Sequence, residues 1–309
     1  MEAGDIHTGF FSKYRRKQFG VGTGKRGAQP VLAVLKGEIH MREITSPENP
    51  NFKKLTALSR KKERDKQGRY VVEGPNLVRE AFLSSAPPEA LFFRQSAVKD
   101  REMRELCLRG SETAGFVLKD SLFDKAAQTE SPQGVMAVVR KPVWTEEMLF
   151  GSGEHGNVLV LDRLQDPGNI GTILRTALGA GFAGAILMKG GGDLYSPKTA
   201  RACAGALFRL PVLFCDTPEE ALSLLDKRGK RVYVTALSAS KAYDQCDLRE
   251  DIALVIGNEG NGVRREFQDG ADALLTIPMA GELESLNAAV AAGILMYEAV
   301  RQRRQSAAK

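Results

Sequence analysis

The sequence predicts an α/β protein with two domains, a small α/β/α domain followed by a domain built on a parallel sheet. Its 309 residues suit two domains of ordinary size. An apolar share of 43% is normal for globular cores and excludes wholesale disorder. In the second half, short continuous apolar runs alternate with helical patterns, as in sheets that helices cover on both faces.

Composition divides the chain into four stretches. Residues 1–50 are expected to be a disordered extension, because glycines interrupt a basic stretch near the start. Met41 resembles a conventional start, so residues 1–40 are either an upstream addition or a flexible arm that contacts RNA. Residues 51–141 form the small domain, residues 142–156 a linker interrupted by Gly and Ser, and residues 157–304 the second domain.

The small domain alternates strands with helices. Apolar runs bounded by turn residues predict strands at 70–74, 90–93, 116–118 and 134–139. Helical patterns cover residues 52–69, 76–83, 98–109 and 121–128. This alternation predicts one sheet with helices on both faces.

The second domain repeats the alternation with more strongly buried strands. They are predicted at 158–161, 185–188, 212–214, 232–236, 253–256 and 274–277. Ser196-Pro197 and Thr217-Pro218 each combine an N-cap with a proline at the first helical position. The last helix is predicted to begin at Ser285, with an apolar face made of Leu286, Ala289, Val290, Gly293, Ile294 and Tyr297.

Basic residues crowd one stretch of the small domain. The net charge of +6 is modest, but only Glu63 and Asp65 offset this stretch. Two interpretations stay open, a solvated helix face and an electrostatic footprint for a polyanion. The basic residues are Lys53, Lys54, Arg60, Lys61, Lys62, Arg64, Lys66 and Arg69.

Several classes of protein are disfavoured by composition. The four cysteines lie far apart without a C-x-x-C pair, which favours reduced thiols in a cytosolic protein and no metal cluster. The three histidines lie in the expected extension and linker, which argues against histidine catalysis and a histidine metal site. The sequence has no run long enough to span a bilayer and no signal-peptide pattern, so we expect no membrane partner.

Three segments of the second domain follow strand-like runs and turn through Gly, Pro, Asn or Ser. They are residues 166–175, 256–262 and 277–287. The carboxyl ends of parallel strands are where open α/β sheets bind ligands, so the three segments can converge on one site. Taken singly, Arg175 could be a surface arginine, residues 257–262 a structural turn, and the small-residue helix after Ser285 a helix contact.

Together the three segments resemble the motifs of the SpoU/TrmH family of RNA 2′-O-ribose methyltransferases, in the SPOUT superfamily. The matching patterns are Asn169-x-Gly171 with Arg175, then Gly257-Asn-Glu-Gly-x-Gly262, then Ile277-Pro-Met with Glu284-Ser-Leu-Asn287. The small domain is similar to the ribosomal-protein-like substrate-binding domain that precedes many of these catalytic domains. That likeness rests on Val72-Glu73-Gly74 and Ser131-Pro132-Gln133-Gly134.

The resemblance implies a parallel sheet whose C-terminal segment is threaded into a deep trefoil knot. It also implies S-adenosylmethionine as the cofactor and no metal. The cofactor would be held at Ala236, Leu237, Gly257, Ile277, Ser285, Leu286 and Asn287.

The same resemblance assigns catalytic roles to Arg175, Glu259 and Asn169. An arginine is a poor base because its pKa lies above about 12, so we expect Arg175 to hold a phosphate and stabilise the ribose alkoxide. Glu259 would orient Arg175 or a neighbour, and Asn169 would shape the loop. The resemblance also implies a homodimer that pairs through this domain, with Arg175 serving a site completed by the partner, and the scattered cysteines indicate a cytoplasmic location.

The expected substrate is RNA, because only RNA carries a 2′-hydroxyl. The basic residues Lys53, Lys54, Arg60, Lys61, Lys62, Arg64 and Arg69 are expected to hold its phosphates. By analogy with the N-terminal domain, 23S-type ribosomal RNA is favoured. A tRNA ribose methyltransferase, an antibiotic-resistance methyltransferase and a non-catalytic RNA-binding or ribosome-assembly protein stay open as alternatives.

Overall fold

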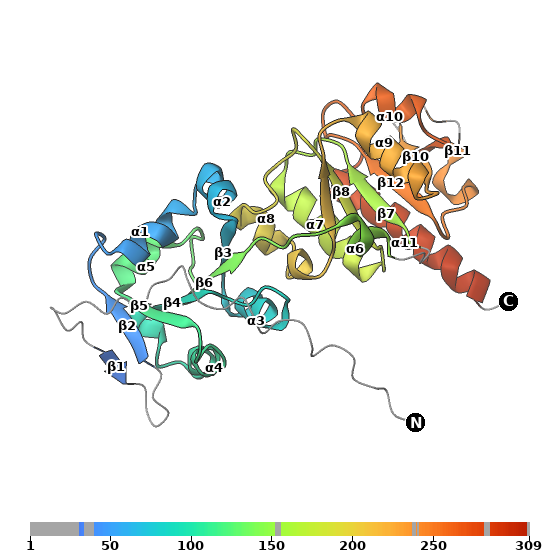
Figure 1. Ribbon diagram of the computed structural model, residues 1–309. Helices are drawn as coiled ribbons and strands as arrows, with labels where there is room; N and C mark the ends of the chain where they lie inside the picture. The colour runs from blue at the N-terminus through green and yellow to red at the C-terminus, as the bar shows by residue number, and fades with distance from the viewer. Residues whose placement is uncertain are drawn as a thin grey trace.

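The computed structural model describes residues 31–33, 40–151, 156–236, 239, 241–280 and 285–307. Within these ranges the chain forms two sheets, one in each half, and Figure 1 shows the two halves side by side. The predicted α/β class and the parallel second sheet are confirmed. The trefoil knot stays a prediction.

The first sheet is mixed, with strand order β1-β2-β5-β4-β6-β3. Parallel pairs join β2 to β5 and β4 to β5, whereas the other neighbours are antiparallel. Its strands are β1 (Val31–Ala33), β2 (His40–Ile44), β3 (Arg69–Glu73), β4 (Ala90–Arg94), β5 (Ala114–Leu118) and β6 (Val135–Arg140).

Helices cover both faces of this sheet. They are α1 (Pro50–Ala57), α2 (Lys61–Gln67), α3 (Pro75–Leu83), α4 (Arg101–Arg109) and α5 (Asp120–Ala126), with the short 3-10 helix η1 (Gln95–Ala97). Phe52 of α1 and Phe123 of α5 pack with Phe92 on one face, and Val78 of α3 and Leu106 of α4 pack on the other.

The second sheet is parallel in every described pair, with strand order β11-β13-β10-β12-β7-β8-β9. Its strands are β7 (Val158–Leu161), β8 (Gly184–Met188), β9 (Val212–Cys215), β10 (Arg231–Thr235), β11 (Lys241–Ala242), β12 (Ile252–Ile256) and β13 (Ala273–Thr276).

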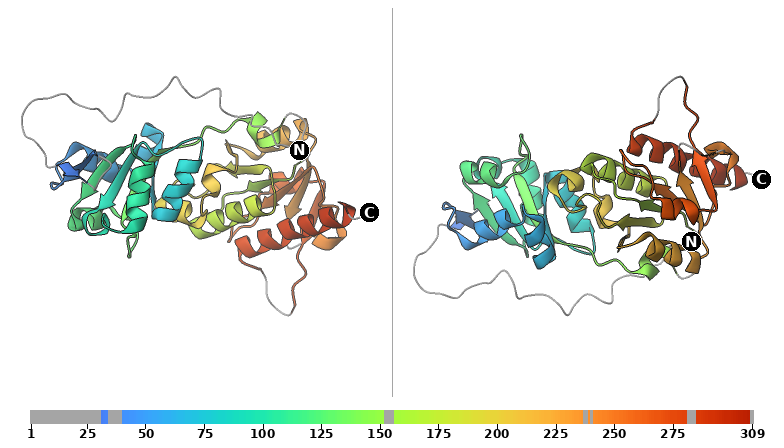
Figure 2. Two further views of the ribbon diagram at one scale, coloured as in Figure 1. Left: turned by 90° about the horizontal axis from the view of Figure 1, so that it is seen from below. Right: turned by 90° about the horizontal axis from the view of Figure 1, so that it is seen from above.

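The helices of the second domain also form two layers. Leu174 of α7 and Leu295 of α11 pack on one face of the sheet, and Leu149 of α6, Leu225 of α9 and Phe267 of α10 on the other. The helices are α6 (Glu146–Phe150), α7 (Pro167–Gly179), α8 (Pro197–Ala202), α9 (Pro218–Lys227), α10 (Arg265–Asp269) and α11 (Ala288–Ala307), with η2 (Ala206–Phe208) and η3 (Tyr243–Gln245). The views in Figure 2 show α11 beside α7 along one side of the sheet.

The two predicted helix starts with a Ser or Thr cap are confirmed. Ser196 accepts a hydrogen bond from the Thr199 N–H at the start of α8, and Thr217 accepts one from the Glu220 N–H at the start of α9. Each cap satisfies an N–H group that has no partner inside its helix.

The junction between the two domains is apolar and closely packed. Tyr70 of β3 is fully buried, and its ring centroid lies 5.0 Å from that of Tyr195 and 6.4 Å from that of Phe208. Arg64 of α2 forms an ion pair with Asp193 across the junction. The hydrophobic core therefore continues from the first domain into the second.

The expected extension and linker both differ from the structure. Residues 40–50 belong to the first domain, because β2 pairs with β5 and buries Met41 and Ile44. Residues 1–30 and 34–39 lie outside the described residues. The expected linker contains α6, which buries Leu149 and Phe150 against the second sheet, so it belongs to the second domain.

The basic helix predicted over residues 52–69 is two helices. The chain turns between α1 and α2, and the Arg64 guanidinium donates to the carbonyl groups of Leu58 and Ser59 in that turn. These side-chain bonds replace the backbone bonds that a continuous helix would have made. The end at Gly68 is as predicted, because Gly68 adopts the left-handed conformation with φ 61°.

The last helix differs from the prediction in its start and in its buried face. It begins at Ala288, after Asn287 rather than at Ser285. Its fully buried side chains are Ala292, Leu295, Met296 and Ala299. Val290 is 51% exposed and Tyr297 54% exposed, so the predicted core face is partly an outer face. Residues 288–300 of this helix are apolar or small except for Glu298, so periodicity alone could not choose between its two faces.

Candidate functional site at the strand ends of the second sheet

Three of the predicted cofactor residues lie at one edge of the second sheet. β13, β10 and β12 are adjacent and parallel, so their carboxyl ends point the same way. Ile277 follows β13, Ala236 follows β10 and Gly257 follows β12. All three residues are partly exposed there. Leu237 lies outside the described residues.

Backbone N–H groups of three predicted cofactor residues are candidate donors to a ligand. The N–H groups of Gly257, Ile277 and Leu286 donate to no other residue in the part of the chain that the structure describes. Partly buried N–H groups need a hydrogen-bond acceptor, and a bound molecule can supply one. These donors around an apolar edge suit a flat heterocycle with nitrogen acceptors, such as the adenine of S-adenosylmethionine.

Side chains from all three sequence segments meet in one hydrogen-bond network. Asn169 donates through Nδ2 to Glu259 Oε1 at 3.0 Å, and Asn287 donates through Nδ2 to Asn169 Oδ1 at 2.9 Å. Glu259 also accepts from the N–H groups of Gln165 and Asp166 at 3.3 and 3.4 Å. Asn169 is therefore the centre that connects the second segment to the third.

The network keeps Glu259 ionised. Burial alone would raise the pKa of this carboxyl, but the hydrogen bonds from Asn169 and from backbone N–H groups outweigh that effect. The net result is a pKa below the ordinary value of 4.5. Glu259 is therefore an acceptor at neutral pH and is not a proton donor.

Local capping sets the position of Asn169. Asp166 caps α7 by accepting a hydrogen bond from the Asn169 N–H at 2.8 Å, and Pro167 occupies the first helical turn. Asn169 thus begins the helix with its backbone fixed, and its side chain can reach the two neighbouring loops.

The glycine-rich second segment closes on itself. Asn258 and Gly262 exchange two backbone hydrogen bonds of 3.0 and 2.9 Å, and Asn258 Oδ1 accepts from the N–H groups of Gly260 and Asn261. A Cβ on Gly257 would lie 2.4 Å from the carbonyl carbon of Gly262. Only glycine fits at position 257, because the loop folds back against its own start.

A buried ion pair near this loop was missed from the sequence. Asp162 is fully buried just after β7 and accepts from the N–H and Nε of Arg264 at 2.8 and 2.7 Å. These bonds fix Arg264, two residues after the glycine-rich segment, and with it the position of the loop. An acidic residue directly after a buried strand, and an arginine two residues after the last glycine, were the available signals.

Arg175 stands apart from the network. It is exposed on α7, and its guanidinium has no hydrogen bond or ion pair to another described residue. Six residues of helix carry it roughly 9 Å along the axis from Asn169. Within one chain, the structure therefore does not bring Arg175 to Glu259. Ser285 is also exposed and makes no hydrogen bond with the described residues.

Asn287 has two roles at the start of α11. Its Oδ1 accepts from the N–H groups of Ala289 at 2.9 Å and Val290 at 3.3 Å, while its Nδ2 donates to Asn169. Asn287, rather than Ser285, is therefore the residue that caps this helix.

Five of the seven predicted phosphate-binding residues are exposed, namely Lys53, Lys54, Arg60, Lys61 and Lys62. The prediction is wrong for Arg64, which is 4% exposed and bonds to Asp193 and two carbonyl groups. It is also wrong for Arg69, whose guanidinium is largely buried against Glu89 and the carbonyl of Gln67. Local sequence could not reveal these partners.

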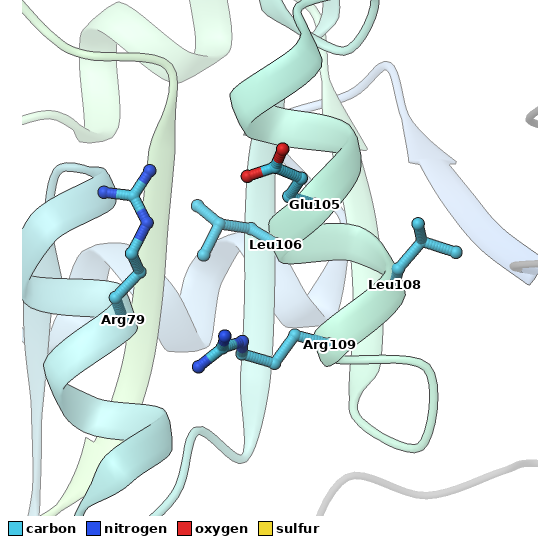
Figure 3. A pocket seen from close by; sticks show the side chains of 5 residues that line it. All are labelled: Arg79, Glu105, Leu106, Leu108 and Arg109. Atoms are coloured by element: carbon cyan, nitrogen blue, oxygen red, sulfur yellow. The ribbon is translucent and has the colours of Figure 1, made fainter.

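A separate hollow of about 410 Å³ lies between α3 and α4 of the first domain. Arg79 extends along it from α3, and Glu105 and Arg109 extend toward it from α4 (Figure 3). No residue of the three segments lines it, so it is not part of the strand-end site.

The described part of the chain gives no sign of a bilayer or metal site. None of its helices is both long and apolar enough to cross a membrane. Within the same ranges, no group of three or more His, Cys, Asp or Glu side chains is placed to hold a metal ion. The four cysteines are buried free thiols.

Fold and site together define a two-domain α/β protein with a candidate ligand site across three parallel strand ends and a basic surface on its first domain. The family model "SpoU rRNA Methylase family" matches residues 156–297, and the model "MRM3-like substrate binding domain" matches residues 49–137. The chain belongs to the SpoU rRNA methylase family.

Similar proteins cover almost the whole of both domains. The 23S rRNA (guanosine(2553)-2'-O)-methyltransferase RlmP of Bacillus subtilis (strain 168) is 36% identical over 83% of this chain and 98% of its own length. The 23S rRNA (uridine(2479)-2'-O)-methyltransferase of Streptomyces viridochromogenes is 32% identical over 85% of this chain and 93% of its own length.

Solved structures agree with this relationship. The SpoU methyltransferase AviRb from Streptomyces viridochromogenes, in complex with the cofactor AdoMet, has a TM-score of 0.77 and 30% identity, covering 83% of this chain and 99% of that one. The AdoMet-bound rRNA methyltransferase from Sinorhizobium meliloti has a TM-score of 0.74 and 31% identity, covering 84% and 98%.

Proposed function

We propose that the protein is an S-adenosylmethionine-dependent methyltransferase that modifies a ribose 2′-hydroxyl in 23S-type ribosomal RNA in the cytoplasm. The observation that carries the proposal is the single network that Asn169, Glu259 and Asn287 form near the ends of β12 and β13, where the N–H groups of Gly257 and Ile277 have no acceptor among the described residues. Support comes from the names of the relatives, which are 23S rRNA 2'-O-methyltransferases, and from the AdoMet complexes of similar structures.

The strand ends would hold the cofactor. Ala236, Gly257 and Ile277 would form the floor, and the N–H groups of Gly257, Ile277 and Leu286, which have no acceptor among the described residues, would bind the adenine and ribose. When bound, S-adenosylmethionine supplies a methyl group on a positively charged sulfur. Glu259 stays ionised and accepts from the Asn169 side-chain N–H, which orients the Asn169 amide. Asn287 donates to the oxygen of the same amide. The pocket is thus shaped before the ligand arrives.

Arg175 would act on the RNA. A ribose hydroxyl is a weak nucleophile, and its developing negative charge needs stabilisation. The guanidinium remains charged at neutral pH, so it can bind the neighbouring phosphate through two N–H groups and lie close to the attacking oxygen. Its distance from the network of its own chain is accounted for if it serves the site of a second chain.

The outer face of α11 would join two copies of the chain. Val290 and Tyr297 are exposed one above the other on this helix, and space around Gly293 between them is open. Aromatic side chains beside small residues suit a close helix contact in an isologous dimer. Pairing there would bring the partner's α7 and its Arg175 toward the strand-end site.

Two measurements test the function. Calorimetry with S-adenosylmethionine should give one site per chain. Ribose methylation mapped across rRNA and tRNA, in cells with and without the protein, should show one or a few 23S-type positions that depend on it. Cofactor binding without any dependent position would favour a non-catalytic RNA-binding protein, and a dependent tRNA position would move the substrate to tRNA.

A further inference from the structure

A cleft of about 450 Å³ lies between the two domains, apart from the predicted cofactor site. One wall comes from the ends of β7, β8 and β9 and the loop of residues 190–192. The other comes from the first domain, through Lys61 and Asp65 of α2 and through Lys141 and Pro142 after β6. β10, β12 and β13, which carry the cofactor residues, contribute nothing to it.

An exposed aromatic side chain lines this cleft. Phe214 of β9 is 58% exposed and lines the opening, while Leu187, its neighbour in register on β8, is buried. Tyr195 and Met188 also contribute to the lining. A large exposed aromatic residue next to a hollow is the arrangement on which a nucleobase stacks in proteins that bind single-stranded nucleic acid.

Cations stand at the rim of the same cleft. Lys189 pairs with Asp216 at 2.9 Å, and both side chains are 69% exposed. Lys61 pairs with Asp65 at 2.7 Å and is 65% exposed. Exposed pairs of this kind contribute little to stability, so either lysine can turn to a phosphate at small cost.

The cleft is continuous with the basic surface of the first domain. Lys61 belongs to both, since it lines the cleft and is one of the exposed basic residues of α1 and α2. The ion pair of Arg64 with Asp193 and the cation of Lys141 over the Tyr195 ring, 4.7 Å from its centroid, fix the two walls relative to each other. An RNA strand that follows the basic surface therefore reaches the cleft.

We propose that this interdomain cleft binds one unpaired nucleotide of the RNA substrate, outside the target nucleotide. The base stacks on Phe214, and its phosphates are held by Lys189 and Lys61. The cavity volume lies in the range of about 300–1,000 Å³ found for small-ligand pockets, which admits a nucleotide. A duplex keeps its base faces stacked inside and cannot offer one to Phe214. The inference rests on the proposed function only in taking RNA as the ligand.

Fluorescence anisotropy with a fluorescein-labelled single-stranded oligoribonucleotide of about 12 nucleotides tests the cleft directly. Phe214→Ala should weaken binding about tenfold, because one base–aromatic stack is lost. Lys189→Ala should weaken binding by a smaller factor. It should also make the fall of log affinity with log salt shallower by about one, because one phosphate contact is lost. Both variants should bind S-adenosylmethionine as the wild type does, and thermal unfolding should show that they remain folded.

Matched controls lie outside the cleft. Leu83→Ala removes an exposed apolar side chain that is 67% exposed on α3, and Lys227→Ala removes an exposed lysine at the end of α9. Both should bind the oligoribonucleotide as the wild type does. A duplex of the same sequence should bind wild type and Phe214→Ala equally.

A reporter variant retains an aromatic ring at the cleft. The chain has one tryptophan, Trp144, so the double variant Trp144→Phe with Phe214→Trp carries its only tryptophan at the cleft. It should bind the single strand nearly as the wild type does, and its fluorescence should be quenched on binding.

The outcomes separate this proposal from the proposed function. If Phe214→Ala binds the single strand within twofold of the wild type and the tryptophan reporter does not respond, the cleft is not an RNA subsite. If those two readouts are as expected but the wild type methylates no RNA, the proposed function fails and the cleft assignment stands. If Phe214 contacts a partner protein and not RNA, Phe214→Ala should bind the single strand as the wild type does and the tryptophan reporter should not respond.

Discussion

Arg175 and Glu259 are both predicted catalytic residues, yet their surroundings differ. Glu259 accepts three hydrogen bonds, from the Asn169 side chain and from the N–H groups of Gln165 and Asp166, so its charge is held in place. Arg175 is exposed, with no partner among the described residues. A charged side chain held by partners shapes a pocket, whereas a free guanidinium on a helix surface is available to an incoming phosphate.

Arg175→Ala should abolish methyl transfer, with a fall of at least about a hundredfold in turnover, because the developing alkoxide loses its stabilising charge. Affinity for S-adenosylmethionine, measured by calorimetry, should stay close to that of the wild type. Arg175→Lys is the matched control, since it keeps the charge but loses the two-pronged phosphate contact, and it should retain partial activity. Near-wild-type turnover in Arg175→Ala would refute the assignment.

The lowered pKa of Glu259 leads us to expect a stability that depends on pH. Because its pKa is lower in the folded chain than the ordinary value of 4.5, the stabilisation is present above pH 4.5 and is lost as pH falls through the folded pKa. Glu259→Gln should therefore lower Tm by on the order of 1–3 °C at neutral pH. The difference should vanish at acid pH below the folded pKa. A Tm difference that stays constant across this range would show that ionisation is not involved.

At the scale of elements, α11 connects several parts of the site. Its N-cap Asn287 joins the network, its inner face carries Leu295 and Met296 into the core, and its outer face exposes Val290 and Tyr297. One helix thus links the cofactor pocket, the core and a proposed dimer contact.

Two substitutions at Asn287 separate its cap from its network bond. Asn287→Ala removes both, and loss of the cap should lower the free energy of unfolding by about 1 kcal/mol. Asn287→Asp retains a capping oxygen but cannot donate to Asn169, so its Tm should remain near that of the wild type. Both variants should bind S-adenosylmethionine more weakly by calorimetry. Unchanged affinity in Asn287→Asp would exclude the network from cofactor binding.

Tyr297→Asp should convert a dimer to monomers, because it places a charge in the middle of an apolar contact. Light scattering after size exclusion gives the mass directly, and Arg265→Asp on the exposed surface of α10 is the control.

If Arg175 serves the partner's site, mixing and refolding Arg175→Ala with Glu259→Ala chains should restore about a quarter of wild-type activity. A monomeric wild type, or no restored activity, would contradict the composite site.

Much of both sheets could be read from the sequence, because strands buried on both faces and helices with Ser-Pro or Thr-Pro starts leave clear local patterns. Ser196 and Thr217 cap as predicted. The prediction of the buried face of α11 was wrong because every position of residues 288–300 except Glu298 is apolar or small. Glu259 and Asn169 were found through their motifs, but their mutual bond depends on the order of the strands, which no local pattern contains.

At the scale of the whole molecule, the domain junction is a continuation of the core. Tyr70, Tyr195 and Phe208 pack across it, and the ion pair of Arg64 with Asp193 lies beside them. Arg64 lies in a basic run, so its position in the sequence indicated a surface role. Its burial depends on the second domain, which supplies Asp193 from 129 residues further along the chain.

Arg64→Ala should loosen the junction at a cost of about 3 kcal/mol, because it removes one partner of a largely buried pair and leaves Asp193 unpaired. We expect the single calorimetric transition of the wild type to split into two, one for each domain, with faster proteolysis near residues 141–145. Arg60→Ala, on an exposed neighbour, is the control. Indistinguishable melting of the two variants would show that the pair does not hold the domains together.

The bond between Asn169 and Asn287 joins residues 118 positions apart, and the bond between Asn169 and Glu259 joins residues 90 apart. A chain leaves the ribosome from its N-terminus, and contacts between distant residues form late because a long loop must first close. The first domain and β7 to β9 can therefore fold while the rest is still being made. The cofactor pocket is completed only when α11 has been synthesised and docked, so a growing chain acquires its methyl-donor site as its last step of maturation.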